Sequence, residues 1–131
     1  MSPFPVTYTD HRAWDPSDSR PYGEIVVYGP KGYERIWALL DTGADDLQIE
    51  DSFAKKIGFD LSVDGYQVPA QTAGGSSINL TCIPGVKVEI EGKIVTVDCL
   101  FGSNSTPLLG RNTILAAMDI GFDVNGWLFK I

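Results

Sequence analysis

The sequence has few of the residues on which disulfide scaffolds, metal centres and histidine-based catalytic sites depend. Its 131 residues include two cysteines and one histidine. Two cysteines are too few for a secreted disulfide scaffold, and Cys82 and Cys99 lack the paired spacing of a zinc site. We interpret them as reduced thiols in the core, with a disulfide as the alternative. His11 lies in a polar, proline-flanked segment and is interpreted as a solvated loop residue, so we expect no metal and no cofactor.

Long hydrophobic runs and an excess of positive charge are also missing. No stretch approaches the ~20 apolar residues of a membrane-spanning helix. The first residues, MSPFPVTYTD, lack the charged and apolar regions of a secretory signal. A formal net charge of −7 argues against nucleic acid or an anionic membrane as the main partner, and it permits a basic peptide. We therefore expect a cytoplasmic domain, unless the chain has been cut from a longer protein.

Apolar residues are plentiful and can build one core. They make up 44% of the chain, enough for a single domain at this length. Met1–Arg20 contains three prolines, which predicts an extended arm or loop. We place an N-terminal arm at residues 1–22 and the globular domain at residues 23–131.

The hydrophobic pattern predicts mostly short strands. Ile25–Tyr28 and Tyr33–Leu40 form a first hairpin, and the apolar run Trp37–Leu40 is typical of a strand buried on both faces. Gly65–Gln71 and Ser77–Ile83 flank a glycine-rich tip and form a second hairpin. Each of these pairs is joined by a turn containing glycine.

A third hairpin turns at Glu91-Gly92, and its register can be predicted. Pairing Ile90 with Lys93 places an apolar set on one face: Val86, Val88, Val95, Val97 and Cys99. The other face is polar: Lys87, Glu89, Thr96 and Asp98. The chain closes with a predicted strand, Trp127–Ile131.

Two short helices are predicted between the strands. Ser52–Ile57 follows a cap candidate at Asp51, and Asn112 can cap a helix that runs to about Met118. Many short strands with two short helices indicate a mainly β domain, closed into a barrel or packed as a sandwich.

The segment ALLDTGADDLQIE carries an apolar run directly into a carboxylate. A turn after Leu40 would place Asp41 at the rim of the core, partly desolvated. Thr42 offers a hydroxyl to fix the turn, and Gly43 allows close backbone approach. A simple Asx-turn that closes the strand explains these residues equally well.

Three segments, in order, resemble the retroviral-type aspartic proteases, the retropepsins and their cellular relatives. ALLDTGADD resembles their active-site stretch, and TAGGSS, residues 72–77, resembles their glycine-rich flap. PLLGRNTIL, Pro107–Leu115, resembles their second signature. The resemblance implies an all-β, retropepsin-like closed barrel or sandwich with one or two short helices and a flap hairpin.

The resemblance implies that Asp41 is the catalytic acid of an endopeptidase cutting extended peptides. One carboxylate must take a proton from water while another gives a proton to the scissile carbonyl oxygen. The chain has one Asp-Thr-Gly, so the resemblance implies a homodimer in which two copies of Asp41 meet on the twofold axis. The alternatives are a dimerisation or peptide-binding module with little or no catalysis, and a β domain whose matches are fortuitous.

The same resemblance gives roles to the neighbours of Asp41. Thr42 is implied to bond to the partner's loop, and Gly43 to contact the substrate backbone. The implied substrate-binding residues are Ala44, Asp45, Asp46, Thr72, Ala73, Gly74 and Gly75. The implied structural support is Leu108, Leu109, Gly110 and Arg111.

Three of these roles carry more specific expectations. Asp45 is expected to form a buried ion pair with Arg111, with a surface charge cluster as the alternative. Family members with Ser or Thr in place of Ala44 can donate a hydrogen bond to the paired aspartates; alanine cannot, so activity is expected at mildly acidic to near-neutral pH. Residues 72–77 are expected to close over the peptide, with an ordinary flexible hairpin as the alternative.

Overall fold

A computed structural model of the protein describes residues 10–13, 20–71, 74–103, 106–123 and 125–130. The strands in these ranges are β1 (Asp10–Ala13), β2 (Tyr22–Gly29), β3 (Gly32–Leu40), β4 (Leu47–Glu50), β5 (Tyr66–Gln71), β6 (Ser77–Ile90), β7 (Lys93–Gly102), β8 (Leu108–Leu109), β9 (Asp119–Asp123) and β10 (Gly126–Lys130). The helices are α1 (Asp51–Lys56), α2 (Leu61–Asp64) and α3 (Arg111–Ala117).

The described helices are all short. None of them is long and apolar enough to pass through a lipid bilayer.

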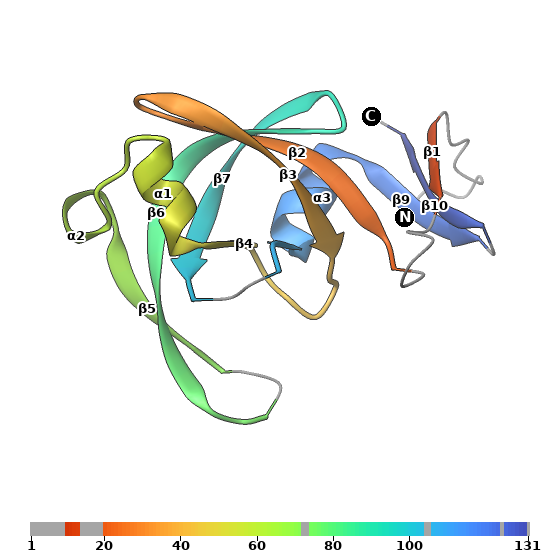
Figure 1. The fold of residues 1–131 in the computed structure, drawn as a ribbon. Coiled ribbons are helices and arrows are strands. Elements are labelled where there is room, and N and C mark those ends of the chain that lie inside the picture. The colour runs from red at the N-terminus through yellow and green to blue at the C-terminus, as the bar shows by residue number, and fades with distance from the viewer. Residues whose placement is uncertain (1–9, 14–19, 72–73, 104–105, 124, 131) are drawn as a thin grey trace.

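The larger sheet closes on itself. Its strand order is β2-β3-β8-β4-β7-β6-β5, and β2 also pairs with β6. Six strands therefore form a closed barrel, and β5 extends from it beside the long strand β6 (Figure 1). The barrel encloses the main core, which includes Ile25, Leu47, Val88, Phe101 and Leu109. The predicted all-β closed fold is confirmed.

The predicted hairpins form, and the third has the predicted pairing at its turn. Tyr28 pairs with Tyr33 across the turn between β2 and β3. Ile90 pairs with Lys93 across the turn between β6 and β7. Local hydrophobic alternation and turn residues are sufficient to specify such antiparallel pairs.

The end of β3 differs from its prediction. Ala38 and Leu40 are buried, but Leu39 is only partly buried and the Trp37 side chain is 49% exposed. Successive side chains of a strand point to opposite faces, and only one face of β3 covers the barrel core. The expectation that this run is buried on both faces is therefore wrong.

A β-bulge shifts the predicted register of β6 and β7. The shift lies between Ile83 and Val86, and Gly85 adopts a φ of 69°, which favours glycine. Beyond the bulge Ile83 pairs with Cys99, so Cys82, the residue before Ile83, lies on the opposite face from Cys99. Both thiols are free and buried, as the core interpretation predicted, and burial raises the pKa of Cys99.

The helices begin at different residues from those predicted. Glu50, not Asp51, is the N-cap of α1, because β4 runs directly into the helix. Gly110, not Asn112, is the N-cap of α3. The Asn112 side chain instead donates to Asp46 at 3.3 Å. Helix α2 is additional to the two predicted helices.

Helix α2 is capped by Asp60. The Ser62 hydroxyl and the Ser62 backbone N–H both donate to Asp60 Oδ1, at 2.6 and 3.0 Å. These bonds favour the charged carboxylate and hold the pKa of Asp60 below its ordinary value of 3.8. A group whose pKa is depressed by folding stabilises the fold above its unfolded-state pKa, and this contribution is lost as the pH falls through the folded-state value.

Replacing Asp60 with alanine should therefore lower the melting temperature most at neutral pH. We expect a loss of about 2–5 °C at neutral pH, shrinking progressively below the ordinary carboxyl pKa. Thermal melts across the acidic range measure this difference. Asp60→Asn is the matched control, since it keeps the acceptor without the charge. If the difference in melting temperature between wild type and Asp60→Ala did not change with pH, this would contradict the role of the Asp60 charge.

A smaller sheet packs beside the barrel. Its order is β1-β10-β9, with Asp10 opposite Phe129 (Figure 1). The predicted terminal strand Trp127–Ile131 is present as β10, with Ile131 outside the described residues. β1 lies in the segment predicted as an arm, and the domain division at residues 22 and 23 stays a prediction.

Candidate functional site

The Asp41 loop leaves the barrel between β3 and β4. The Asp41 N–H donates to the Leu109 carbonyl oxygen at 3.0 Å, and the Ala44 N–H donates to the Asp41 carbonyl oxygen at 3.1 Å. The Gly43 N–H donates to Asp41 Oδ1 at 2.8 Å. This last contact is an Asx-turn, which fixes the orientation of a partly exposed carboxylate. The Asx-turn that was the simpler interpretation of the motif is thus present, and it orients the Asp41 carboxylate.

Strand β8 lies directly behind this loop. Leu108 and Leu109 pair in parallel with the last two residues of β3, and Leu109 is fully buried. Gly110 follows at a very close approach: a Cβ on it would lie 2.4 Å from the Asp46 carbonyl oxygen. Only glycine fits between these backbones. The structure therefore brings the predicted support residues into contact with the predicted site.

Arg111 joins two parts of the loop. Its Nη1 donates to the Thr42 carbonyl oxygen at 2.8 Å, and its Nη2 forms an ion pair with Asp45. The two side chains are 49% and 70% exposed, respectively, because both project from the barrel surface. The expected ion pair forms, but its expected burial is wrong in the single chain. An exposed pair contributes little free energy, so its main effect is to position the loop.

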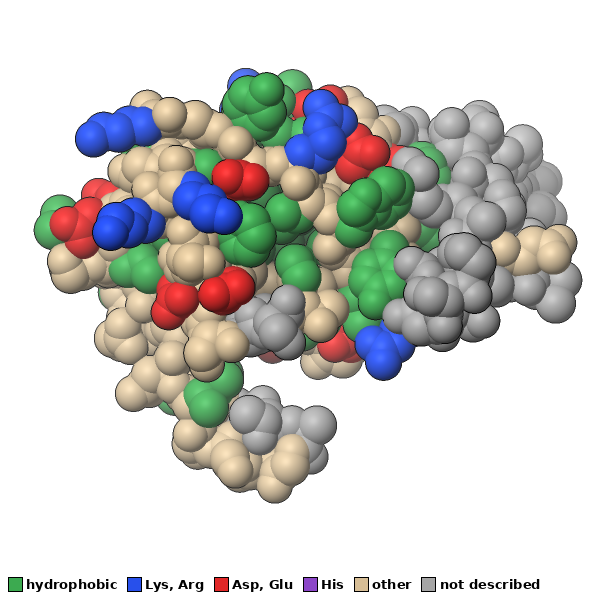
Figure 2. All heavy atoms as spheres, viewed as in Figure 1, with side chains coloured by type: hydrophobic (Ala, Val, Ile, Leu, Met, Phe, Trp, Pro, Cys, Tyr) green, Lys and Arg blue, Asp and Glu red, His purple; other side chains and the backbone are tan. Residues whose placement is uncertain are grey.

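A cavity of about 440 Å³ opens beside the loop. The loop contributes Gly43, Ala44, Asp45 and Asp46 to its wall. The β5–β6 hairpin contributes Tyr66, Val68, Pro69, Ala70 and Cys82. Figure 2 shows that this hairpin projects from the body of the molecule and leaves a hollow between them. The predicted catalytic loop and the predicted flap hairpin thus face a common cavity.

The hairpin tip is described only in part. Gly74 and Gly75 are exposed, and Gly75 has a φ of 83° with open space around it. Glycine adopts this left-handed conformation without strain. Thr72 and Ala73 lie outside the described residues.

Some residues of the cavity have no predicted role. They are Gln48, Tyr66, Val68, Pro69, Ala70, Cys82, Asp98 and Leu100. The parallel pairing of β4 with β7 brings Asp98 and Leu100 to the loop, and such long-range parallel pairing has no local sequence signal. A hydrogen bond with Cys82 raises the pKa of Tyr66, and the nearby Asp98 and Asp46 charges raise it further.

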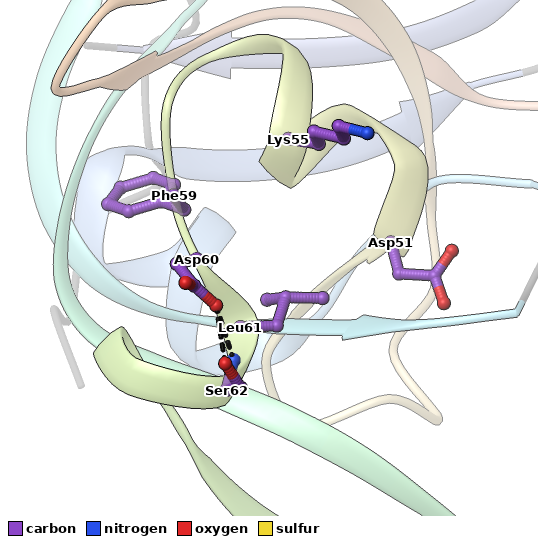
Figure 3. Close-up of a pocket in the computed structure, with 6 residues that line it drawn as sticks. All are labelled: Asp51, Lys55, Phe59, Asp60, Leu61 and Ser62. Carbon is purple, nitrogen blue, oxygen red and sulfur yellow. Dashed lines mark hydrogen bonds between the residues drawn. The ribbon is translucent and has the colours of Figure 1, made fainter.

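A second cavity lies between α1 and α2 and has a different character. Its volume is about 430 Å³, and Figure 3 shows its lining: Asp51, Lys55, Phe59, Asp60, Leu61 and Ser62. The Asp60 carboxylate is bonded to Ser62 and serves the helix cap. We therefore place the candidate site at the Asp41 loop.

Comparison with known protein families gives a match that covers this site. The family described as "Aspartyl protease" matches residues 26–113, more than half of the chain. The matched range runs from β2 into α3. It includes the Asp41 loop, the β5–β6 hairpin and the Gly110-Arg111 support.

Proposed function

The chain belongs to the aspartyl protease family, and on this premise we propose that it is an endopeptidase whose active form is a homodimer. The observation that carries the proposal is the Asp41 loop. It presents an oriented carboxylate at the end of a core strand, beside a cavity of about 440 Å³. A positioned carboxylate beside a cavity can act in general acid–base catalysis on a group bound there.

The proposed mechanism uses one Asp41 from each copy. Two adjacent carboxylates share one proton, because both cannot be charged side by side. The charged carboxylate takes a proton from a water molecule, which attacks the scissile carbonyl carbon. The protonated carboxyl group gives its proton to the carbonyl oxygen. The tetrahedral intermediate then collapses: the carboxylate that gave its proton takes one back from a hydroxyl of the intermediate, the C–N bond breaks, and the departing amine receives the proton that the other carboxyl group took from water.

The homodimer follows from the number of motifs. The chain contains one Asp-Thr-Gly, and the reaction needs two carboxylates. A twofold axis through the loop supplies the second from an identical copy. Thr42 is exposed beside Asp41, and we propose that it bonds to the partner's loop.

The substrate is proposed to be an extended peptide in the cavity beside the loop. β5 ends the order of the larger sheet, so its outer edge has backbone groups that a peptide strand can pair with. Ala44, Asp45 and Asp46 line the cavity from the loop side. Residues 72–77 are proposed to close over the peptide and exclude water. The two free, buried thiols fit a reducing compartment such as the cytoplasm, which we propose as the location.

The proposal predicts peptide cleavage that depends on association. The full chain should cleave an unfolded casein-like protein, and a statine-type transition-state mimic should block the cleavage. Sedimentation measured beside the assay should show that specific activity rises with the dimer fraction. Full activity in a strict monomer would overturn the dimer. Peptide binding without cleavage would favour a binding module.

A further inference from the structure

Two carboxylates lie side by side next to the proposed active site. β4 and β7 pair in parallel, with Leu47 opposite Cys99. Asp46 and Asp98 each come one residue before this pair, so the register makes them neighbours. Both residues line the cavity beside the loop, and both also line a third cavity, of about 350 Å³. The two carboxylates therefore stand where the two cavities meet.

The charge of this region is not balanced by the described residues. The walls of the cavity beside the loop and of the third cavity together contain three carboxylates and, among the residues that the structure describes, no lysine or arginine. Asp45 is paired with Arg111, but the described residues give neither Asp46 nor Asp98 an ion pair. Like charges close to one another repel, and a cation between them would offset this repulsion.

A buried hydroxyl in the third cavity also lacks a hydrogen-bond partner among the described residues. Thr113 lines that cavity and is 1% exposed, and its Oγ1 has no hydrogen-bond partner among the described residues. A buried hydroxyl without a partner carries an energetic cost that an incoming hydrogen-bonding group can relieve. This observation is independent of the two carboxylates, and it points to a ligand with a hydrogen-bonding group, which a lysine or arginine side chain supplies.

We propose that Asp46 and Asp98 form a subsite for a lysine or arginine side chain of the peptide substrate. This proposal rests on the proposed peptidase function and specifies its substrate class. The aliphatic stem would lie along Leu100, which lines the cavity beside the loop and lies on the same face of β7 as Asp98. The cationic group would donate to the carboxylates, and Thr113 offers a further acceptor.

Paired peptides test the subsite. A library with lysine at each position around the cleavage site identifies the position that favours it, and a norleucine peptide then serves as the neutral comparison. We expect kcat/KM to favour lysine by about fivefold to tenfold at low salt, and the preference to fall as salt is added. Asp98→Asn should remove most of this preference. Asp51→Asn, which removes a charge at the distant cavity between α1 and α2, should retain it.

The outcomes separate this inference from the proposed function. Cleavage without a lysine or arginine preference at any position, or a preference unchanged in Asp98→Asn, overturns the subsite and leaves the peptidase intact. If no peptide is cleaved, the peptidase fails, and fluorescence anisotropy with the same peptide pair tests the subsite. Tighter binding of the lysine peptide that is lost in Asp98→Asn supports it, whereas equal binding or no binding overturns it.

Discussion

Replacement of Asp41 by asparagine should lower kcat/KM for peptide cleavage by about 10²- to 10⁴-fold. A carboxamide cannot take a proton from the attacking water, although its oxygen can still accept the Gly43 N–H bond that shapes the loop. The fold should therefore remain, with an unchanged melting transition and circular dichroism spectrum. Asp51→Asn is the matched control, because Asp51 lies on α1 at the other cavity. Cleavage that survives in Asp41→Asn would show that Asp41 is not the catalytic acid.

The same variant tests the shared active site when it is mixed with wild-type protein. If subunits exchange freely, an equal mixture contains about one quarter wild-type homodimers, so activity should fall to about one quarter of that of undiluted wild type. Independent monomers would retain about one half. Activity measured after full subunit exchange distinguishes the two values, and a result of one half would contradict an active site formed by two copies.

Replacement of Gly110 by alanine should lower the free energy of unfolding by about 1–3 kcal/mol or more. The new Cβ would lie 2.4–2.5 Å from backbone atoms of Asp45 and Asp46, and backbone cannot move aside as a flexible side chain can. Separation of these segments would also displace Leu109, whose carbonyl oxygen accepts the Asp41 N–H bond. Stability and cleavage activity should therefore fall together. Urea unfolding gives the first quantity, and a peptide assay gives the second.

Gly32→Ala is the matched control for this prediction. Gly32 begins β3, and a Cβ placed on it meets no atom within 4 Å. Its effect should remain within about 0.5 kcal/mol of zero, as for most surface substitutions. Equal losses at Gly110 and Gly32 would show that the close approach behind the Asp41 loop has no special importance.

The sequence predicts best the features that depend on neighbouring residues. The hairpin registers follow from turn residues and alternation, as in the pairing of Ile90 with Lys93. The Asp-Thr-Gly motif and the later Gly-Arg-Asn predict one loop and its support. Their order along the chain identifies the family, and the structure places Arg111 in contact with Thr42.

The features that could not be predicted depend on contacts between distant segments. The position of Asp98 beside Asp46 requires the parallel pairing of β4 and β7, and no local pattern encodes this pairing. The exposure of Trp37 depends on which face of β3 the rest of the barrel covers. The exposure of the Asp45–Arg111 pair likewise depends on the shape of the surface around it.

The contact between Arg111 and Thr42 has a consequence for the synthesis of the protein. The two residues are 69 positions apart in the chain, yet their bond helps to shape the loop that carries Asp41. A growing chain on the ribosome that ends before Arg111 lacks this bond. Strand β8, which lies behind the loop, is translated only just before Arg111. The Asp41 loop is therefore translated long before the residues that order it, so we expect the proposed proteolytic activity only after Arg111 has emerged from the ribosome.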